Sequence, residues 1–87
     1  MKEITYFYLA RCPYCRRADQ FIAELIEENP EFKDIPITKI EESENPEVAN
    51  SYDYYYVPCL YIGKDKLHEG AATKEQLRKV LEAAMER

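Results

Sequence analysis

Apolar positions near the start of the chain follow two different patterns. Ile4–Leu9 is a continuous run of aromatic and β-branched residues, apolar on both faces, which is typical of a strand buried inside a sheet. From Pro13 the apolar residues recur at steps of three and four with acidic residues between them, which predicts an amphipathic helix. Proline is favoured at the first helical position, and Asn29 before Pro30 avoids the helical region. The predicted helix therefore begins at Pro13 and stops at Asn29.

The middle of the chain predicts one strand and one short helix. Ile35–Ile40 alternates in the manner of a strand, and Pro36 places it at the edge of a sheet because proline cannot donate to a central ladder. Asn45 followed by Pro46 is a plausible cap and first position for a second helix that runs to about Tyr52.

The last third of the chain predicts a hairpin and a closing helix. Cys59–Ile62 and Lys66–His68 flank Gly63 as two strands joined by a turn. The segment Thr73–Gln76 matches a capping box, which marks the start of a helix. Its apolar face then continues at helical spacing through Leu77, Val80, Leu81 and Ala84.

The element order is thus strand, helix, strand, helix, strand, strand, helix. This order joins a βαβ unit to a β-hairpin and a final helix, which indicates the α/β class. A chain of 87 residues has room for one core, so residues 1–87 are expected to form a single domain.

Composition and charge narrow the possible partners. Hydrophobic residues make up 46% and charged residues 33%, which is ordinary for a chain that folds. The net charge of −5 removes any general attraction to phosphate backbones, so nucleic acid is not expected as a partner. The longest nearly uncharged stretch, Tyr54–Gly63, is far shorter than the roughly 20 apolar residues of a bilayer-spanning helix, so no membrane association is expected. The first residues lack the pattern of a secretory signal, so we expect a cytoplasmic, monomeric protein.

Two of the three cysteines lie three positions apart, where the first strand becomes the first helix. An odd number of cysteines does not fit the disulfide framework of a small secreted protein. Cys12 falls at the helix N-cap, where the positive end of the helix dipole and the nearby Arg11 and Arg16 favour a thiolate. Cys15 lies one turn further on, within reach of a disulfide. This placement favours thiol–disulfide exchange, in which Cys12 attacks and Cys15 resolves.

Two other interpretations of the cysteines remain open. Cys12, Cys15 and Cys59, with His68 as a fourth ligand, could form a zinc site, although structural zinc usually takes its ligands from paired knuckles. The cysteines could also be inert buried thiols, an interpretation that the surrounding arginines make less favourable. We therefore expect no metal.

The motif Cys12-Pro13-Tyr14-Cys15 resembles the active site of the glutaredoxins, within the thioredoxin superfamily, and the resemblance extends over nearly the whole chain. It implies a thioredoxin-like fold with a four-stranded mixed sheet flanked by three helices. It also implies that Val57-Pro58 matches the family's cis-proline pair, and that Pro13, Tyr14, Val57 and Pro58 contact the substrate. A cis bond there turns the preceding backbone outward, where it can pair with an extended substrate.

The chain departs from the glutaredoxin pattern where that family holds glutathione. Tyr56 stands where a threonine is usual, and Leu9 stands where a basic residue is common. The Gly-Gly-x-Asp type of turn is replaced by the segment Glu69–Thr73. No tightly bound cofactor is expected, and glutathione, although possible as a co-substrate, is expected to be a poor one.

The function expected from these residues is reduction of disulfides in proteins or small molecules, with electrons from a reductase or glutathione. A glutathione-dependent glutaredoxin and a redox-inactive adaptor module are the alternatives; an iron–sulfur carrier fits less well because Pro13 follows the first cysteine. Together with Tyr14, the four tyrosines before Pro58 could line a shallow aromatic groove for a peptide or thiol substrate; they are Tyr52, Tyr54, Tyr55 and Tyr56. Tyr14 is expected at the surface, whereas these four are expected mainly to pack in the core. Cys59 is expected to behave as a small buried hydrophobe.

Overall fold

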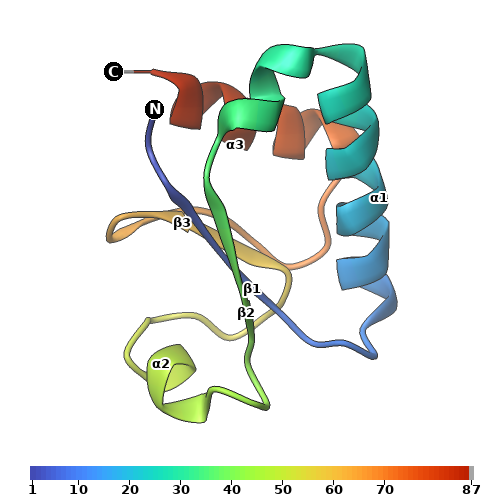
Figure 1. Cartoon of the computed structure of the whole chain (residues 1–87). Coiled ribbons are helices and arrows are strands. Elements are labelled where there is room, and N and C mark those ends of the chain that lie inside the picture. The colour runs from blue at the N-terminus through green and yellow to red at the C-terminus, as the bar shows by residue number, and fades with distance from the viewer. Residues whose placement is uncertain (87) are drawn as a thin grey trace.

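The computed structural model describes residues 1–86 and has the predicted order of strands and helices, with one added 3-10 helix (Figure 1). Four strands form one mixed sheet in the order β2-β1-β3-β4, in which β1 pairs in parallel with β2 and antiparallel with β3. The elements are β1 (Ile4–Tyr8), α1 (Pro13–Glu28), η1 (Pro30–Asp34), β2 (Ile37–Glu41), α2 (Pro46–Asn50), β3 (Cys59–Ile62), β4 (Asp65–Glu69) and α3 (Lys74–Met85).

The structure corrects three predicted strand boundaries in the first half of the chain, including the end of β2, which lies at Glu41 rather than Ile40. β1 ends at Tyr8 because the Leu9 carbonyl accepts a turn hydrogen bond from the Cys12 N–H at 3.1 Å. β2 begins at Ile37 rather than Ile35, since the Ile35 N–H closes the unpredicted η1 by bonding to Phe32. The strand is nevertheless at the edge of the sheet, as predicted.

Later boundaries also shift by one or two residues. α2 ends at Asn50, short of the predicted Tyr52, because the N–H groups of Ser51 and Tyr52 bond to carbonyls only three residues back. β4 extends beyond the predicted Lys66–His68 by one residue at each end. The capping box at the start of α3 is confirmed, with hydrogen bonds in both directions between Thr73 and Gln76.

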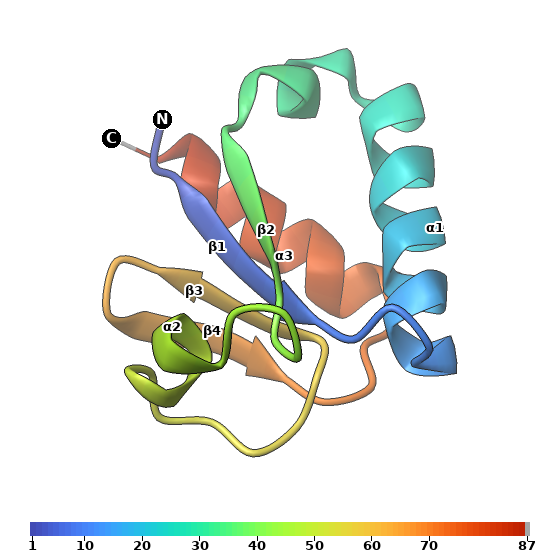
Figure 2. The same ribbon diagram turned by 60° about the horizontal axis from the view of Figure 1, so that its bottom comes forward.

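The two faces of the sheet carry separate cores. Helices α1 and α3 cover one face, and the short α2 lies on the other (Figure 2). Because side chains alternate along a strand, β1 sends Ile4 and Tyr6 toward α1 and α3 and Phe7 toward α2. In the described part of the chain, no helix is long and apolar enough to cross a membrane.

The strand register brings the functional motifs to one end of the sheet. Phe7 pairs with Cys59, so the chain that leaves β1 toward Cys12 passes the segment that enters β3 through Pro58. Tyr8 is in register with the last residue of β2, and Cys59 with the last residue of β4. The C-terminal ends of β1, β2 and β4 and the start of β3 therefore surround the first turn of α1.

Candidate active site

Cys12 is held at the start of α1 with its thiol partly exposed. Its backbone is extended, its carbonyl accepts hydrogen bonds from the N–H groups of Cys15 and Arg16 at 3.1 Å, and Pro13 occupies the first helical position. The Cys12 side chain makes no capping hydrogen bond. The first helical turn is thus closed by backbone bonds, and the thiol of Cys12 is accessible for reaction with a substrate.

Cys15 lies one helical turn later and is 1% exposed. Burial, the neighbouring Cys12 side chain and the Asp19 carboxylate all raise the pKa of the Cys15 thiol, to about 12. A protonated, buried thiol next to a partly exposed one is the arrangement expected of a resolving cysteine beside an attacking cysteine.

A buried tyrosine ties β1 to this turn of the helix. The Tyr6 hydroxyl donates hydrogen bonds to the Cys15 carbonyl at 3.2 Å and to the Asp19 carboxylate at 2.9 Å. Asp19 also pairs with Lys39 of β2 at 3.2 Å. Burial, followed by the bond to Asp19, raises the pKa of the Tyr6 hydroxyl, so the hydroxyl stays a donor. Asp19 was not identified from the sequence, although its position four residues after Cys15 places it on the same helix face.

The Val57-Pro58 peptide bond is cis, as the family resemblance predicted. Pro58 is buried, and its carbonyl accepts a hydrogen bond from the Gly70 N–H at 2.9 Å. Val57 is half-buried and packs against the core on the α2 face. The structure therefore places Val57 and Pro58 at the same end of the sheet as Cys12.

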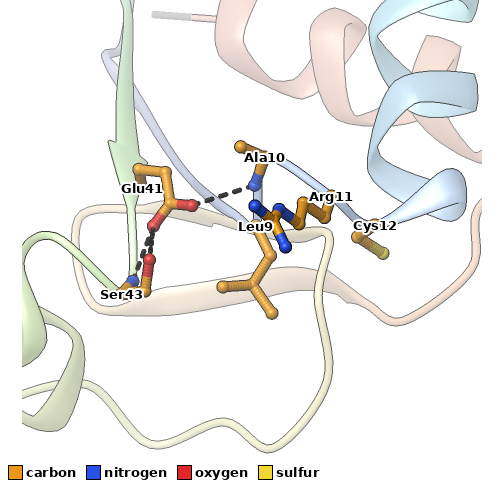
Figure 3. Close-up of a pocket in the computed structure, with 6 residues that line it drawn as sticks. All are labelled: Leu9, Ala10, Arg11, Cys12, Glu41 and Ser43. Atoms are coloured by element: carbon orange, nitrogen blue, oxygen red, sulfur yellow. Dashed lines mark hydrogen bonds between the residues drawn. The ribbon is translucent and has the colours of Figure 1, made fainter.

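A shallow pocket of about 330 Å³ opens beside Cys12, as Figure 3 shows. The Glu41 carboxylate forms its far wall and accepts hydrogen bonds from the Ala10 N–H at 2.9 Å and from the N–H and hydroxyl of Ser43 at 2.6 Å. These donors lower the pKa of Glu41 and keep it charged. The lining residues are Leu9, Ala10, Arg11, Cys12, Glu41 and Ser43.

The two arginines predicted to stabilise the thiolate are both exposed. Arg11 lines the pocket with Cys12, and Arg16 follows Cys12 by one helical turn. Neither forms an ion pair with another residue of the range 1–86. Their effect on the thiolate stays a prediction.

The zinc alternative has no support in the geometry. Within the described range, no group of three or more histidine, cysteine or acidic side chains is arranged to hold a metal ion. The His68 ring lies against the carbonyls of Gly70 and Ala71, at 3.0 and 3.1 Å. Cys59 is fully buried on the α2 face, and burial raises the pKa of its thiol to about 12.

The tyrosines before Pro58 divide into two pairs. Tyr52 and Tyr54 pack against Phe7 with ring centroids 4.7 and 4.8 Å apart, as predicted. Tyr55 and Tyr56, in contrast, are 85% and 70% exposed, so the prediction that they pack in the core was wrong. Tyr14 is at the surface, as predicted, with 54% of its area exposed.

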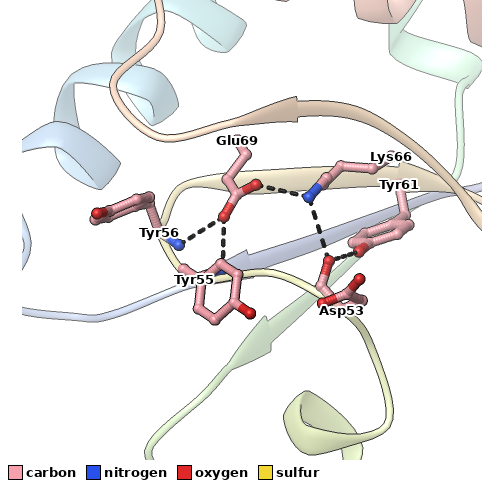
Figure 4. Close-up of polar contacts among 6 residues, drawn as sticks. All are labelled: Asp53, Tyr55, Tyr56, Tyr61, Lys66 and Glu69. Carbon is pink, nitrogen blue, oxygen red and sulfur yellow. Dashed lines mark hydrogen bonds and ion pairs between the residues drawn. The ribbon is translucent and has the colours of Figure 1, made fainter.

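A carboxylate from β4 binds the backbone of the two exposed tyrosines, as Figure 4 shows. Glu69 accepts hydrogen bonds from the backbone N–H groups of Tyr55 and Tyr56 at 2.5 and 3.0 Å, and it pairs with Lys66 at 2.7 Å. Lys66 and the Tyr61 hydroxyl also donate to the Asp53 carbonyl. No local sequence signal links Glu69 to the tyrosines, which precede it by more than ten residues.

Comparisons with known proteins agree with this architecture. A family model described as Thioredoxin matches residues 2–86. A thioredoxin from Methanocaldococcus jannaschii is 32% identical over 75 residues, which cover 86% of each chain. The structure of oxidized mitochondrial thioredoxin 3 from Saccharomyces cerevisiae superposes with a TM-score of 0.72 at 24% identity, over 94% of this chain and 77% of that one.

A second solved structure shows the same fold. A mutant thioredoxin from Halobacterium salinarum superposes with a TM-score of 0.68 at 24% identity, over 97% of this chain and 74% of that one. The expected thioredoxin fold is confirmed, with its four-stranded mixed sheet and three helices. These relatives are named thioredoxins, and the narrower glutaredoxin subtype gains no support from them.

Proposed function

The chain belongs to the thioredoxin family, and on that premise we propose that it is a small dithiol–disulfide oxidoreductase that reduces disulfides through Cys12 and Cys15. The observation that carries the proposal is the pair itself. A partly exposed thiol at a helix N-terminus lies one turn from a buried thiol, at the end of the sheet where the half-buried Val57 and the buried Pro58 lead into β3.

The reaction proceeds in two exchange steps. The Cys12 thiolate attacks one sulfur of the substrate disulfide, the substrate S–S bond breaks, and the departing sulfur leaves as a thiolate that takes up a proton. Cys15 then loses its proton and attacks the Cys12 sulfur of the mixed disulfide. This step releases the second substrate thiol and leaves a Cys12–Cys15 disulfide. The substrate gains two electrons and two protons, and an external dithiol or reductase must return the electrons.

Three cysteine variants test these roles. Cys12→Ser is expected to abolish turnover of a disulfide substrate, because the attacking thiolate is gone. Cys15→Ser is expected to accumulate the mixed disulfide at Cys12, which intact-protein mass spectrometry detects. Cys59→Ala is the matched control and retains turnover, since Cys59 is buried on the α2 face.

Turnover measurements on the same variants also distinguish the proposed oxidoreductase from a redox-inactive adaptor. A redox-inactive adaptor would show no cycling of the cysteine pair between dithiol and disulfide, and the Cys12→Ser variant would still bind its partner. Turnover that survives in Cys12→Ser would contradict the proposed mechanism.

We further propose that glutathione is a poor electron source for this protein. Glutathione carries two carboxylates and an ammonium group, which need charged or hydrogen-bonding partners when they bind. The pocket beside Cys12 presents an apolar Leu9 and the charged Glu41, and only Arg11 supplies a cation. Gly70 is followed by two alanines, so the aspartate expected to meet the ammonium group is missing.

A comparison of two electron sources tests this proposal. Turnover of a small disulfide is measured with glutathione plus glutathione reductase and with NADPH plus a flavoenzyme thioredoxin reductase. We expect the second system to support the faster turnover. Efficient, saturable turnover with glutathione and none with the flavoenzyme would contradict this proposal. It would instead support a glutathione-dependent glutaredoxin, whose active-site motif Cys-Pro-Tyr-Cys resembles.

A further inference from the structure

The pocket beside Cys12 contains two charged side chains of opposite sign. Arg11 and Glu41 both line it, as Figure 3 shows, and neither forms an ion pair with another residue of the range 1–86. A few charged or polar groups that face a pocket are what fixes the orientation of a small ligand. The pocket can therefore receive a ligand that carries both a positive and a negative group.

The Glu41 carboxylate is fixed relative to the reactive cysteine. One of its oxygens accepts a hydrogen bond at 2.9 Å from the N–H of Ala10, which precedes Cys12 by two residues. The other oxygen accepts hydrogen bonds from the N–H and hydroxyl of Ser43 at 2.6 Å. All of these donors are neutral, so they hold the carboxylate in place without compensating its charge. A carboxylate that is ordered in advance loses little freedom when it binds a cation.

The charge changes sign across the pocket. The loop after β2 is acidic, because Glu42 and Glu44 follow Glu41. Among the described residues that line the pocket, Arg11 is the only cation, and it lies next to the reactive cysteine. The pocket is therefore negative on the β2 side and positive on the α1 side, and such a field orients a ligand that carries both charges.

The size and lining of the pocket favour a small ligand. Its volume of about 330 Å³ is at the lower end of the range for ligand pockets, which is roughly 300–1,000 Å³. Leu9 and Ala10 supply apolar surface against which a methylene group can pack. An α-amino acid carries an ammonium and a carboxylate group on one carbon atom. Its two charges and its short side chain match this pocket.

We infer that the pocket binds the α-amino-acid end of a small disulfide, with the ammonium group at Glu41 and the carboxylate at Arg11. The inference rests on the proposed function and names a substrate class for it, the disulfides of thiol-bearing α-amino acids such as cystine. The Cys12 thiolate attacks one sulfur of the disulfide, the S–S bond breaks, and the departing amino-acid thiolate takes up a proton. Cys15 then loses its proton, attacks the Cys12 sulfur and releases the second amino-acid thiol. The substrate gains two electrons and two protons, and the cysteine pair is oxidised to a disulfide.

Glutathione matches this arrangement less well. Its cysteine is joined by peptide bonds on both sides, so the carbon next to the sulfur-bearing one carries neither an ammonium nor a carboxylate group. Glutathione also has two carboxylates, and the Glu41 carboxylate repels a like charge. The same charges thus favour an amino-acid disulfide and disfavour glutathione.

The test uses four small disulfides that differ in charge. They are cystine, which carries both groups; cystamine, which carries only ammonium groups; dithiodipropionate, which carries only carboxylates; and neutral hydroxyethyl disulfide. The reduced protein is mixed with an excess of each disulfide at low ionic strength, and acid quenching with mass spectrometry gives the rate constant for oxidation of the cysteine pair. Each rate constant is divided by that for hydroxyethyl disulfide, which cancels any change in the thiolate itself. The readout is the change of this ratio on mutation, because the four disulfides differ in intrinsic reactivity.

The two charges are removed one at a time. Glu41→Gln should lower the ratios for cystine and cystamine about fivefold, the upper range for an exposed ion pair, and should not lower that for dithiodipropionate. Arg11→Gln should lower the ratio for cystine and not that for cystamine. Added salt should weaken both effects. Glu44→Gln removes the same charge from the same loop, but Glu44 lines a different hollow, so this control keeps the wild-type ratios.

Three results would overturn the inference. They are cystine and cystamine ratios that Glu41→Gln leaves unchanged, an equal fall of these ratios in Glu44→Gln, and a cystine ratio that Arg11→Gln leaves unchanged. In each case the preference would not come from the paired charges of the pocket. Wild-type protein that none of the four disulfides oxidises would instead show that the proposed function fails.

Discussion

The Cys15 side chain is buried at the point where α1 meets the sheet, and under the proposed function this position should decide how the resolving step responds to pH. Burial is the first cause of the raised pKa of its thiol, followed by the Cys12 side chain and the Asp19 carboxylate. Once Cys12 is in a mixed disulfide, it no longer contributes a charge, but burial and Asp19 remain. Cys15 is therefore mostly protonated at neutral pH.

The rate of the resolving step should rise with pH across the neutral range. In the mixed disulfide, burial and Asp19 still raise the pKa of Cys15, and below that pKa the thiolate fraction increases ~tenfold for each pH unit, so the rate of attack should follow it. Rapid mixing of a preformed Cys12 mixed disulfide, followed by release of the substrate thiol, measures this rate. A rate independent of pH between neutral and mildly alkaline conditions would contradict the assignment of a raised pKa to Cys15.

Asp19→Asn tests how the carboxylate acts on Cys15. A negative charge raises the pKa of a nearby thiol, so removing it should lower the pKa of Cys15 and make the resolving step faster at a given pH. Asparagine can still accept the Tyr6 hydrogen bond, which keeps the local geometry. Glu24→Gln, further along α1, serves as the control. A slower step in Asp19→Asn would show instead that Asp19 accepts the proton of Cys15.

The loop between α2 and β3 has no regular structure of its own, and β4 holds it in place. Glu69 meets two of its backbone N–H groups, and Lys66 and Tyr61 meet the Asp53 carbonyl. Backbone N–H and C=O groups that lack a partner within the loop thus form their hydrogen bonds with side chains of the neighbouring strands. The order of this loop therefore depends on contacts with the β3–β4 hairpin.

Glu69→Gln should lower stability in a way that depends on pH. Lys66 and the Tyr55 and Tyr56 N–H groups lower the pKa of Glu69 to about 2 in the folded protein, below its ordinary value. The carboxylate thus contributes stability that is fully present above its unfolded pKa and is lost as the pH falls through the folded one. Urea unfolding should show the largest difference between wild type and Glu69→Gln near neutral pH and a shrinking difference toward pH ~2. A difference that grows on acidification would exclude this role.

In the molecule as a whole, the larger of the two cores lies between the sheet and helices α1 and α3. Helices α1 and α3 pack on one face of the sheet through side chains that are almost wholly buried, whereas the α2 face holds a smaller aromatic cluster. A chain of this length buries a smaller share of its surface than a larger domain does, so each core residue matters more.

Leu77→Ala should show this dependence. Leu77 is 1% exposed between α3 and the sheet, and such a truncation costs about 2–5 kcal/mol of unfolding free energy. In a domain of this size each kcal/mol lowers Tm by about 4–8 °C. Thermal unfolding by circular dichroism measures the shift, and Val48→Ala at the surface should leave Tm nearly unchanged. If both variants lowered Tm by a similarly small amount, the core between α3 and the sheet would not be the main source of stability.

Contiguous residues were enough to predict most elements, and they also provided the hypothesis that Cys12 and Cys15 react as a pair. Pro13 and the capping box at Thr73 mark helix starts because a helix end is satisfied by its own neighbours in the chain. The Cys12-Pro13-Tyr14-Cys15 and Val57-Pro58 motifs identified the end of the sheet at which the site lies. The sequence predicted the ends of the elements less well than their types. At β2, for example, the Ile35 N–H bonds within the unpredicted η1, so the strand begins later than expected.

Only the tertiary structure decided which tyrosines of the loop before β3 are buried and which are exposed. Tyr52, Tyr54, Tyr55 and Tyr56 are the same residue type within five positions, so no local pattern separates the buried pair from the exposed pair. The separation comes from Phe7 on one strand, which receives two of the rings, and from Glu69 on another, which holds the backbone of the other two. Such contacts join residues that are distant in the chain, and they exist only after β1, β3 and β4 have paired.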